Sequence, residues 1–137
     1  RACSRWSVAD AIPALLRRAL ALVRAHQPAA HAALTTALDG LTIALTIGDA
    51  MALHSDAGAL LEVAVPPRAD IRLAAERPAI TALVLGRATL TQSLRSGAVE
   101  LAGTTAALRR GLLGFEYFVS ALLRIDAADE LRRELEI

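Results

Sequence analysis

The sequence predicts a single α+β domain, and two features of its 137 residues support this fold class. First, apolar residues recur about every 3.6 positions in the first third, alternate with period two over residues 41–73, and then return to the helical period. Strands grouped in one run and helices in others, without strict alternation, are typical of α+β proteins. Second, the length corresponds to one domain, because domains usually hold about 100–200 residues.

The composition excludes several classes of protein. Apolar residues make up 55% of the chain and the mean hydropathy is +0.44, values that exclude disorder. No stretch of sequence reaches the roughly 18 apolar residues of a membrane span. The single cysteine, Cys3, excludes an intrachain disulfide, and the absence of lysine excludes a Schiff-base or P-loop lysine.

The net charge and the number of cysteines limit which partners and which cellular compartment are expected. The net charge of +1 leaves no footprint of nucleic-acid binding, so no nucleic-acid partner is expected. All 15 basic residues are arginine, which indicates a GC-rich coding sequence and a bacterial source. Because no signal peptide is visible and only one cysteine is present, we expect the reducing cytoplasm as the compartment.

Residues 1–28 are predicted to form an N-terminal helix. Asp10 can cap this helix, and Pro13 falls in its first turn, where a missing N–H costs little. The apolar stripe of the helix consists of Ile12, Leu15, Leu16, Ala19, Leu22 and Val23. A second, short helix is expected from Ala29 to Leu38, because the turn residues Asp and Gly follow it directly.

Residues 41–103 are predicted to hold a sheet with inserted helices. Leu41–Ile47, Ala50–His54 and Ala59–Val65 show the period-two pattern and are joined by short turns, so they should form an antiparallel meander. Two prolines end the third strand, and a short fourth strand is expected over residues 71–73.

The rest of the chain is predicted to be mostly helical. The pattern places helices at residues 78–85 and 88–95, a fifth strand at residues 99–101, and C-terminal helices over residues 104–137. Thr104 or Thr105 can cap the first C-terminal helix. The last helix is expected to run from Ile125 to Ile137, with its acidic residues on the solvent face.

No residue pattern predicts catalysis. His54 and Asp56 stand close together at a strand end, but the available nucleophiles, Ser55, Ser93 and Ser96, all lie outside a G-x-S-x-G turn. A solvent-facing turn histidine is therefore the preferred interpretation of His54. The chain is predicted to have no catalytic residue and not to be an enzyme.

The histidines do not predict a metal site either. His26 and His31 are five positions apart across a proline, so they do not share one helical face as a pair of metal ligands would. A cysteine-rich site is excluded by composition. We therefore expect neither a bound metal nor a cofactor.

The aromatic residues are concentrated in one segment. Three of the four, Phe115, Tyr117 and Phe118, lie within four positions of one another. Because large side chains bury the most area, this segment is either a packing anchor for the late helices or one wall of an apolar cavity. Spacing alone favours the packing anchor.

The N-terminal region is basic. Residues 1–35 hold a single acid and five arginines, namely Arg1, Arg5, Arg17, Arg18 and Arg24. An amphipathic helix with a basic polar face can rest transiently on an anionic membrane surface. An ordinary cover helix explains the same pattern and is the preferred interpretation.

The order of the segments carries a resemblance. After the three meander strands come Ala69-Asp70-Ile71-Arg72-Leu73, Ile80–Leu85 with Gly86, Ser93–Gly97, Ala98–Gly103 and a leucine-rich helix. Over residues 30–115 this order resembles the sterol carrier protein 2-like (SCP2) family, whose members tend to show an Ala-Asp-led strand and a closing strand before Gly-Asp. Thr104 departs from that pattern, although threonine can cap the same helix.

The resemblance implies a fold and a function. It implies a five-stranded, mainly antiparallel sheet covered by helices, with an apolar tunnel between them. It also implies a non-catalytic domain that binds and carries a sterol, a fatty acyl chain or another lipid. The alternative is a structural or regulatory interaction module, for example a homodimerising accessory domain of a hydrolase or a transcription regulator.

The expected ligand site lies between one sheet face and the helices. Large meander side chains at odd-numbered positions should share that face: Ile43, Leu45, Met51, Leu53, Leu61 and Val63. Phe115 and Phe118 are three apart and should point the same way, within a lid formed by residues 115–122. The predicted cavity residues are Ile43, Leu45, Met51, Leu53, Leu83, Leu90, Leu94, Leu112, Phe115, Phe118 and Leu122.

Overall fold

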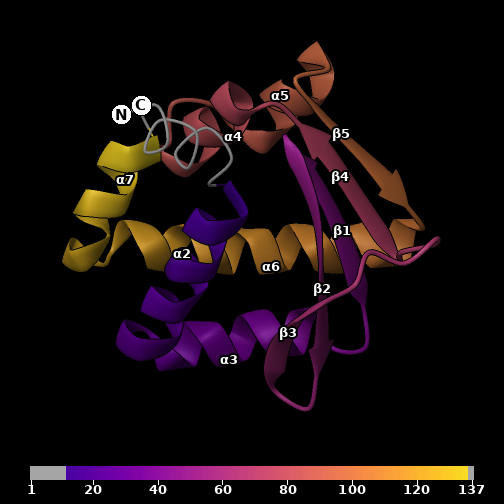
Figure 1. The fold of residues 1–137 in the computed structure, drawn as a ribbon, viewed down its shortest axis with the longest axis horizontal. Coiled ribbons are helices and arrows are strands. Elements are labelled where there is room, and N and C mark those ends of the chain that lie inside the picture. Colours follow the sequence, from indigo (N-terminus) through magenta and orange to yellow (C-terminus); the bar gives the residue numbers. More distant parts are fainter. Residues whose placement is uncertain (1–11, 136–137) are drawn as a thin grey trace.

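The structure of the protein is a computed structural model that describes residues 12–135 (Figure 1). The helices are α2 (Ile12–His26), α3 (Pro28–Ala37), α4 (Arg77–Val84), α5 (Leu90–Ser96), α6 (Thr105–Leu123), the 3-10 helix η1 (Asp126–Ala128) and α7 (Asp129–Leu135). The strands are β1 (Thr42–Ile47), β2 (Asp49–Asp56), β3 (Ala59–Val63), β4 (Ile71–Ala75) and β5 (Val99–Gly103). The predicted cap Asp10, together with Cys3, Arg1 and Arg5, lies outside the described residues. Within that range no helix is both long and apolar enough to cross a membrane.

The five strands form one open, mixed sheet in the order β3-β2-β1-β4-β5. Antiparallel pairing joins β1 to β2, β2 to β3 and β4 to β5, which confirms the predicted meander and the mainly antiparallel sheet. Strand β4 runs parallel to β1, because residues 64–70 carry the chain from the β3 edge back to the other side of β1. The central strand is therefore β1, with β2 on one side and β4 on the other.

The prediction that Leu61 and Val63 share the sheet face covered by helices is wrong, as the register of β3 shows. Strands β1 and β2 pair odd-numbered residues with odd ones, whereas β2 and β3 pair odd-numbered residues with even ones. The cause is the two-residue turn of Ala57 and Gly58, whose φ angles of 52° and 82° are those of a tight hairpin turn. Leu61 and Val63 consequently lie exposed on the outer face, and Leu60 takes the inner position.

Helices cover one face of the sheet, called here the inner face. Figure 1 shows α2, α3 and α6 together on that side, with α4 and α5 at one end of the strands. Inner-face residues such as Leu45 and Leu73 point toward the helices, whereas Thr46 and Arg72 on the outer face are exposed. The molecule thus has two layers, and its core lies between them.

The core is divided into two clusters of buried apolar residues. One joins α2, the end of β1, α4, the end of α6 and the α7 region, with Val23 and Leu122 among its most buried members. The other joins Leu34 of α3 and its C-cap residue Leu38 to β4 and the start of α6. Phe118 packs against both clusters, so it lies where they approach each other.

Two glycines let α6 approach its neighbours closely. A Cβ atom on Gly114 would lie 3.0–3.2 Å from side-chain atoms of Leu34 on α3 and of its C-cap residue Leu38. A Cβ atom on Gly111 would lie 2.6 Å from Cδ1 of Ile71 on β4. Glycine within a helix costs about 1 kcal/mol relative to alanine, and close packing against α3 and the sheet explains its presence here.

Capping residues set the helix boundaries as the sequence suggests. Thr104 Oγ1 accepts a hydrogen bond from the N–H of Ala107 at 3.1 Å, so Thr104 and not Thr105 caps α6. Thr89 and Gln92 form a capping box at the start of α5. Gly97 ends α5 in the left-handed conformation with φ 79°.

The C-terminal segment differs from the predicted continuous helix. Ile125 is extended, with φ −104° and ψ 113°, and a 3-10 turn separates it from α7. The Arg132 guanidinium donates to the carbonyl oxygens of Leu122 at 3.0 Å and Ile125 at 3.3 Å. These bonds satisfy carbonyls at the end of α6, so the chain can turn and lay α7 against α2.

Candidate functional site

A cavity of about 140 Å³ lies between the inner face of the sheet and the helices. Its sheet wall consists of Ile43, Leu45, Leu53, Leu60, Ile71, Leu73 and Leu101. Its helix walls consist of Leu16, Leu20, Leu34, Leu38, Leu90, Leu108, Gly111, Leu112, Gly114, Phe115 and Phe118. Every one of these 18 residues is Leu, Ile, Phe or Gly, so the cavity offers no polar side chain to a ligand.

The strand register creates the sheet wall. Ile43 stands opposite Leu53 on β2 and Ile71 on β4, and Leu73 continues the row to Leu101 on β5. Since side chains alternate between faces along a strand, these positions form one continuous apolar surface. Ile43 and Leu73 are only half-buried although they lie in the middle of the sheet, because they face the cavity and not a packed neighbour.

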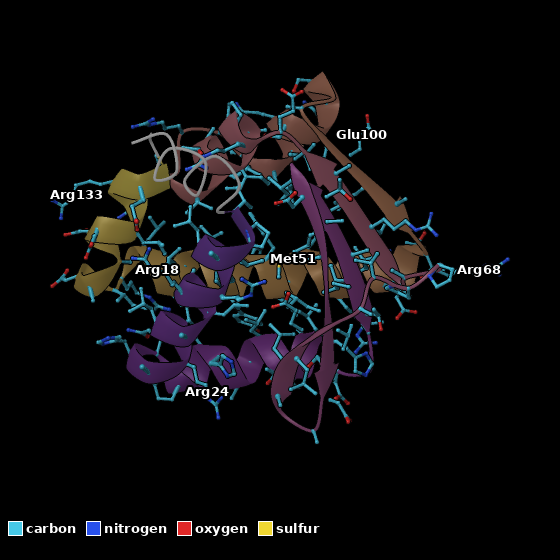
Figure 2. The ribbon with its side chains drawn as sticks, viewed as in Figure 1. Arg18, Arg24, Met51, Arg68, Glu100 and Arg133 are labelled. Atoms are coloured by element: carbon cyan, nitrogen blue, oxygen red, sulfur yellow. The ribbon has the colours of Figure 1, made fainter. Side chains whose placement is uncertain are left out.

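The structure brings together seven of the eleven predicted cavity residues: Ile43, Leu45, Leu53, Leu90, Leu112, Phe115 and Phe118. The remaining four do not line the cavity. Met51 is buried on the helix side of β2 (Figure 2), and Leu83 is a buried residue of α4 itself. Leu94 is exposed in a surface groove, and Leu122 packs in the core beside a second, smaller cavity.

Sequence reasoning missed the contribution of the first two helices. Leu16 and Leu20 of α2, with Leu34 of α3 and its C-cap residue Leu38, form one side of the cavity. The apolar stripe predicted for this helix includes Leu16, but no residue of the helix is among the predicted cavity residues. The missed signal is that Leu16 and Leu20 are four apart and hence adjacent on the helix surface, as are Leu34 and Leu38.

The aromatic segment has both of the roles that the sequence left open. Phe115 and Phe118 line the cavity, and Phe118 also packs against both core clusters. Tyr117 points away and is 37% exposed. A second apolar cavity of about 60 Å³ shares Leu16 and Phe118 with the first, so these two side chains separate the two spaces.

Two of the residues weighed for catalysis, His54 and Ser55, are held in structural hydrogen bonds. Thr42 Oγ1 and His54 Nδ1 are 2.9 Å apart across β1 and β2. The fully buried Ser55 hydroxyl donates to the carbonyl oxygen of Thr35 at 2.8 Å, tying β2 to α3. Because His54 and Ser55 are consecutive in a strand, their side chains point to opposite faces and do not meet.

Metal-ligating side chains are not gathered within residues 12–135. No group of three or more His, Cys, Asp or Glu in that range is placed to hold a metal ion. His26 and His31 belong to different helices, α2 and α3. The cavity itself holds none of these residue types.

Comparison with solved structures identifies the fold. The solution structure of the sterol carrier protein domain 2 of Helicoverpa armigera superposes with a TM-score of 0.60 and 8% identity, covering 88% of this chain and 94% of that one. The UbiJ-SCP2 ubiquinone synthesis protein gives 0.58 and 16%, covering 82% and 94%. Sterol carrier protein 2 like 2 from Aedes aegypti gives 0.55 and 15%, covering 75% and 94%. No protein-family model and no curated protein matches the sequence. The chain therefore has the SCP2 fold, as the resemblance implied.

Proposed function

We propose that this chain, whose fold is that of the sterol carrier protein 2 domain, binds a lipid or similar apolar molecule between its sheet and helices. In this proposal it carries the ligand without changing it chemically. The observation that supports the proposal is the cavity of about 140 Å³, lined entirely by Leu, Ile, Phe and Gly. A cavity of this size with purely hydrocarbon walls is suited to apolar molecules.

Affinity would come from hydrophobic transfer. Burial of apolar surface contributes about 25 cal/mol per Å², and each methylene group about 0.8 kcal/mol. The walls hold no donor or acceptor side chain that would orient the buried part of a ligand. Discrimination among chains of similar length would therefore be weak, which suits a carrier of a lipid class.

The cavity must enlarge to take a whole lipid. Sites for drug-sized ligands measure roughly 300–1,000 Å³, well above the volume found here. Phe118 and Leu16 separate the cavity from the neighbouring space of about 60 Å³. Rotation of Phe118 would join the two spaces, and outward movement of the α6 segment 115–122 would widen them further.

A binding experiment on a blocked cavity tests the proposal. Native mass spectrometry of the purified protein should reveal an apolar ligand, and a fluorescent fatty acid should bind at micromolar levels. Leu45→Trp fills the cavity from the central strand and should abolish binding of the fluorescent fatty acid. Thr46→Trp is the matched control, because the neighbouring position faces outward and is exposed.

The results separate the alternatives. Binding lost in Leu45→Trp and kept in Thr46→Trp supports a ligand inside the cavity. Absence of any bound or bindable apolar ligand at micromolar levels would refute the proposal. Equal binding by both variants would place the ligand elsewhere on the molecule.

A second candidate function rests on the exposed face of α6. Leu112, Leu113, Tyr117 and Leu123 are 36–49% exposed along this helix. Apolar residues grouped on one surface are typical of protein contact sites. An interaction or dimerisation module would show a stable dimer in native mass spectrometry, and Leu113→Arg would dissociate it without changing ligand binding.

A further inference from the structure

The outward side of α6 forms one continuous exposed stripe, called here the α6 stripe. Its members recur at intervals of three or four positions, with two leucines side by side in the middle: Thr105, Arg109, Leu112, Leu113, Glu116, Ser120 and Leu123. The opposite side of the helix carries Gly114 and Phe118, which pack against α3 and the core. Helix α6 therefore has one face committed to the fold and one face open to a partner.

The middle of the α6 stripe is apolar. Leu112 is 36% exposed and Leu113 is 45% exposed. Tyr117, one turn beyond Leu113, is 37% exposed and widens the apolar area. Because removal of apolar surface from water is favourable, grouped exposed side chains of this kind are typical of contact sites.

Charges of opposite sign flank the two leucines at equal distances. Arg109 precedes Leu112 by three positions, and Glu116 follows Leu113 by three. The two charged residues are two helical turns apart, a rise of about 10.5 Å, so they cannot pair with each other. Within residues 12–135 neither side chain takes part in a hydrogen bond or an ion pair. The fold itself thus leaves both charges without a partner in the described part of the chain.

This arrangement is complementary to its own reverse. Two antiparallel copies of α6 would place Arg109 of each copy opposite Glu116 of the other, with Leu112 opposite Leu113. Two parallel copies would instead bring like charges together, which is unfavourable. A contact that uses the same patch on both chains closes as a dimer with a twofold axis, the commonest form of protein oligomer.

From this symmetry we infer that the α6 stripe binds a second copy of this chain, antiparallel, about a twofold axis between Leu112 and Leu113. Two reciprocal ion pairs of Arg109 with Glu116 select the orientation and the register. The leucines of both copies form the apolar centre of the contact. Since Leu112 also lines the cavity, the second copy covers this part of the cavity wall from outside. The inference rests on the second candidate function and adds the partner, its orientation and the residues that select it.

Charge reversal tests the ion pairs. Sedimentation velocity of the unaltered chain at micromolar concentration and low salt should show a dimer that weakens as ionic strength rises. Arg109→Glu leaves only acidic charge on the α6 stripe, and Glu116→Arg leaves only basic charge. Each variant alone should therefore dimerise about tenfold more weakly, because both attractive pairs become repulsive. Arg24→Glu, at an exposed position of α2, makes the same change in net charge as Arg109→Glu and should leave the dimer intact.

Rescue of the dimer tests the orientation. An equal mixture of Arg109→Glu and Glu116→Arg should form a mixed dimer in native mass spectrometry, because every contact between the two variants again joins opposite charges. The double variant, Arg109→Glu with Glu116→Arg, should dimerise as the unaltered chain does. Both residues are exposed, so circular dichroism should show that all variants keep the fold.

Each outcome decides the inference. An unaltered chain that is monomeric at micromolar concentration overturns it together with the second candidate function, and leaves lipid binding to be judged by the fluorescent fatty acid. A dimer that survives both single reversals lies on another surface and overturns the inference, while dimerisation itself stands. Folded single variants that fail to associate when mixed also overturn it, because the antiparallel register requires that pairing.

Discussion

Asp70 and Thr42 exchange two hydrogen bonds where β4 begins to pair with β1. The N–H of Thr42 donates to Oδ2 of Asp70 at 2.8 Å, and the N–H of Asp70 donates to the carbonyl oxygen of Thr42 at 2.9 Å. The two hydrogen bonds hold the end of the connection formed by residues 64–70 against the point where β1 and β4 begin their parallel pairing. The Ala-Asp step that contributed to the family resemblance thus has a direct structural role.

Asp70→Ala should lower the free energy of unfolding by about 1 kcal/mol, because the N–H of Thr42 loses its side-chain acceptor. Asp70→Asn keeps an acceptor oxygen and should lose less. Urea denaturation of the two variants measures the difference. Equal losses would show that charge at this position matters more than the hydrogen bond.

Gly103→Ala should destabilise the fold more than Gly97→Ala does. The φ angle of Gly103 is +155°, and a Cβ atom on this residue would lie 2.5 Å from the backbone oxygen of Asp70. Gly97 also has a positive φ, +79°, but its Cβ would meet open space. We expect a loss of about 1 kcal/mol for Gly97→Ala, from conformation alone, and above about 2 kcal/mol for Gly103→Ala. Thermal melts of both variants check the ranking.

Phe118→Ala should enlarge the cavity and shift ligand preference toward bulkier molecules. The loss of stability should fall below the roughly 3–5 kcal/mol of a fully packed phenylalanine, since Phe118 already faces two cavities. Tyr117→Ala, on the exposed side of the same helix, is the control. A large drop in melting temperature with unaltered lipid binding would make Phe118 a packing residue only.

His31 should make stability depend on pH. Burial and then the charge of Arg24 lower its pKa in the folded protein, and the other charged residues in the surface groove between α2 and β3 are the paired Arg17 and Glu62. The unfolded chain therefore binds the proton more readily, so this contribution is present above about pH 6.5 and is lost as the pH falls. The effect should be small because His31 is only partly buried. The slope of stability against pH in this window should flatten in His31→Gln and persist in His26→Gln.

Local rules of the sequence predicted most of the secondary structure. Threonine at Thr104 caps a helix through its own hydroxyl, and Gly97 ends one because glycine adopts a positive φ without strain. The period-two pattern of Leu41–Ile47 and Ala50–His54 predicted which of their residues share a face. These features depend on neighbours within a few positions, so they can be read without knowledge of the fold.

The tertiary structure alone decided which leucines surround the cavity. A two-residue turn shifted the register of β3 by one, and this moved Leu61 outward and Leu60 inward. Segments that are far apart in the chain meet at the cavity. Helix α6 approaches β4 closely at Gly111, and Leu20 and Leu60 line the same cavity. Periodicity specifies which face of an element is apolar. What that face meets depends on pairing register and on the distance between packed elements, and both are set by non-local contacts.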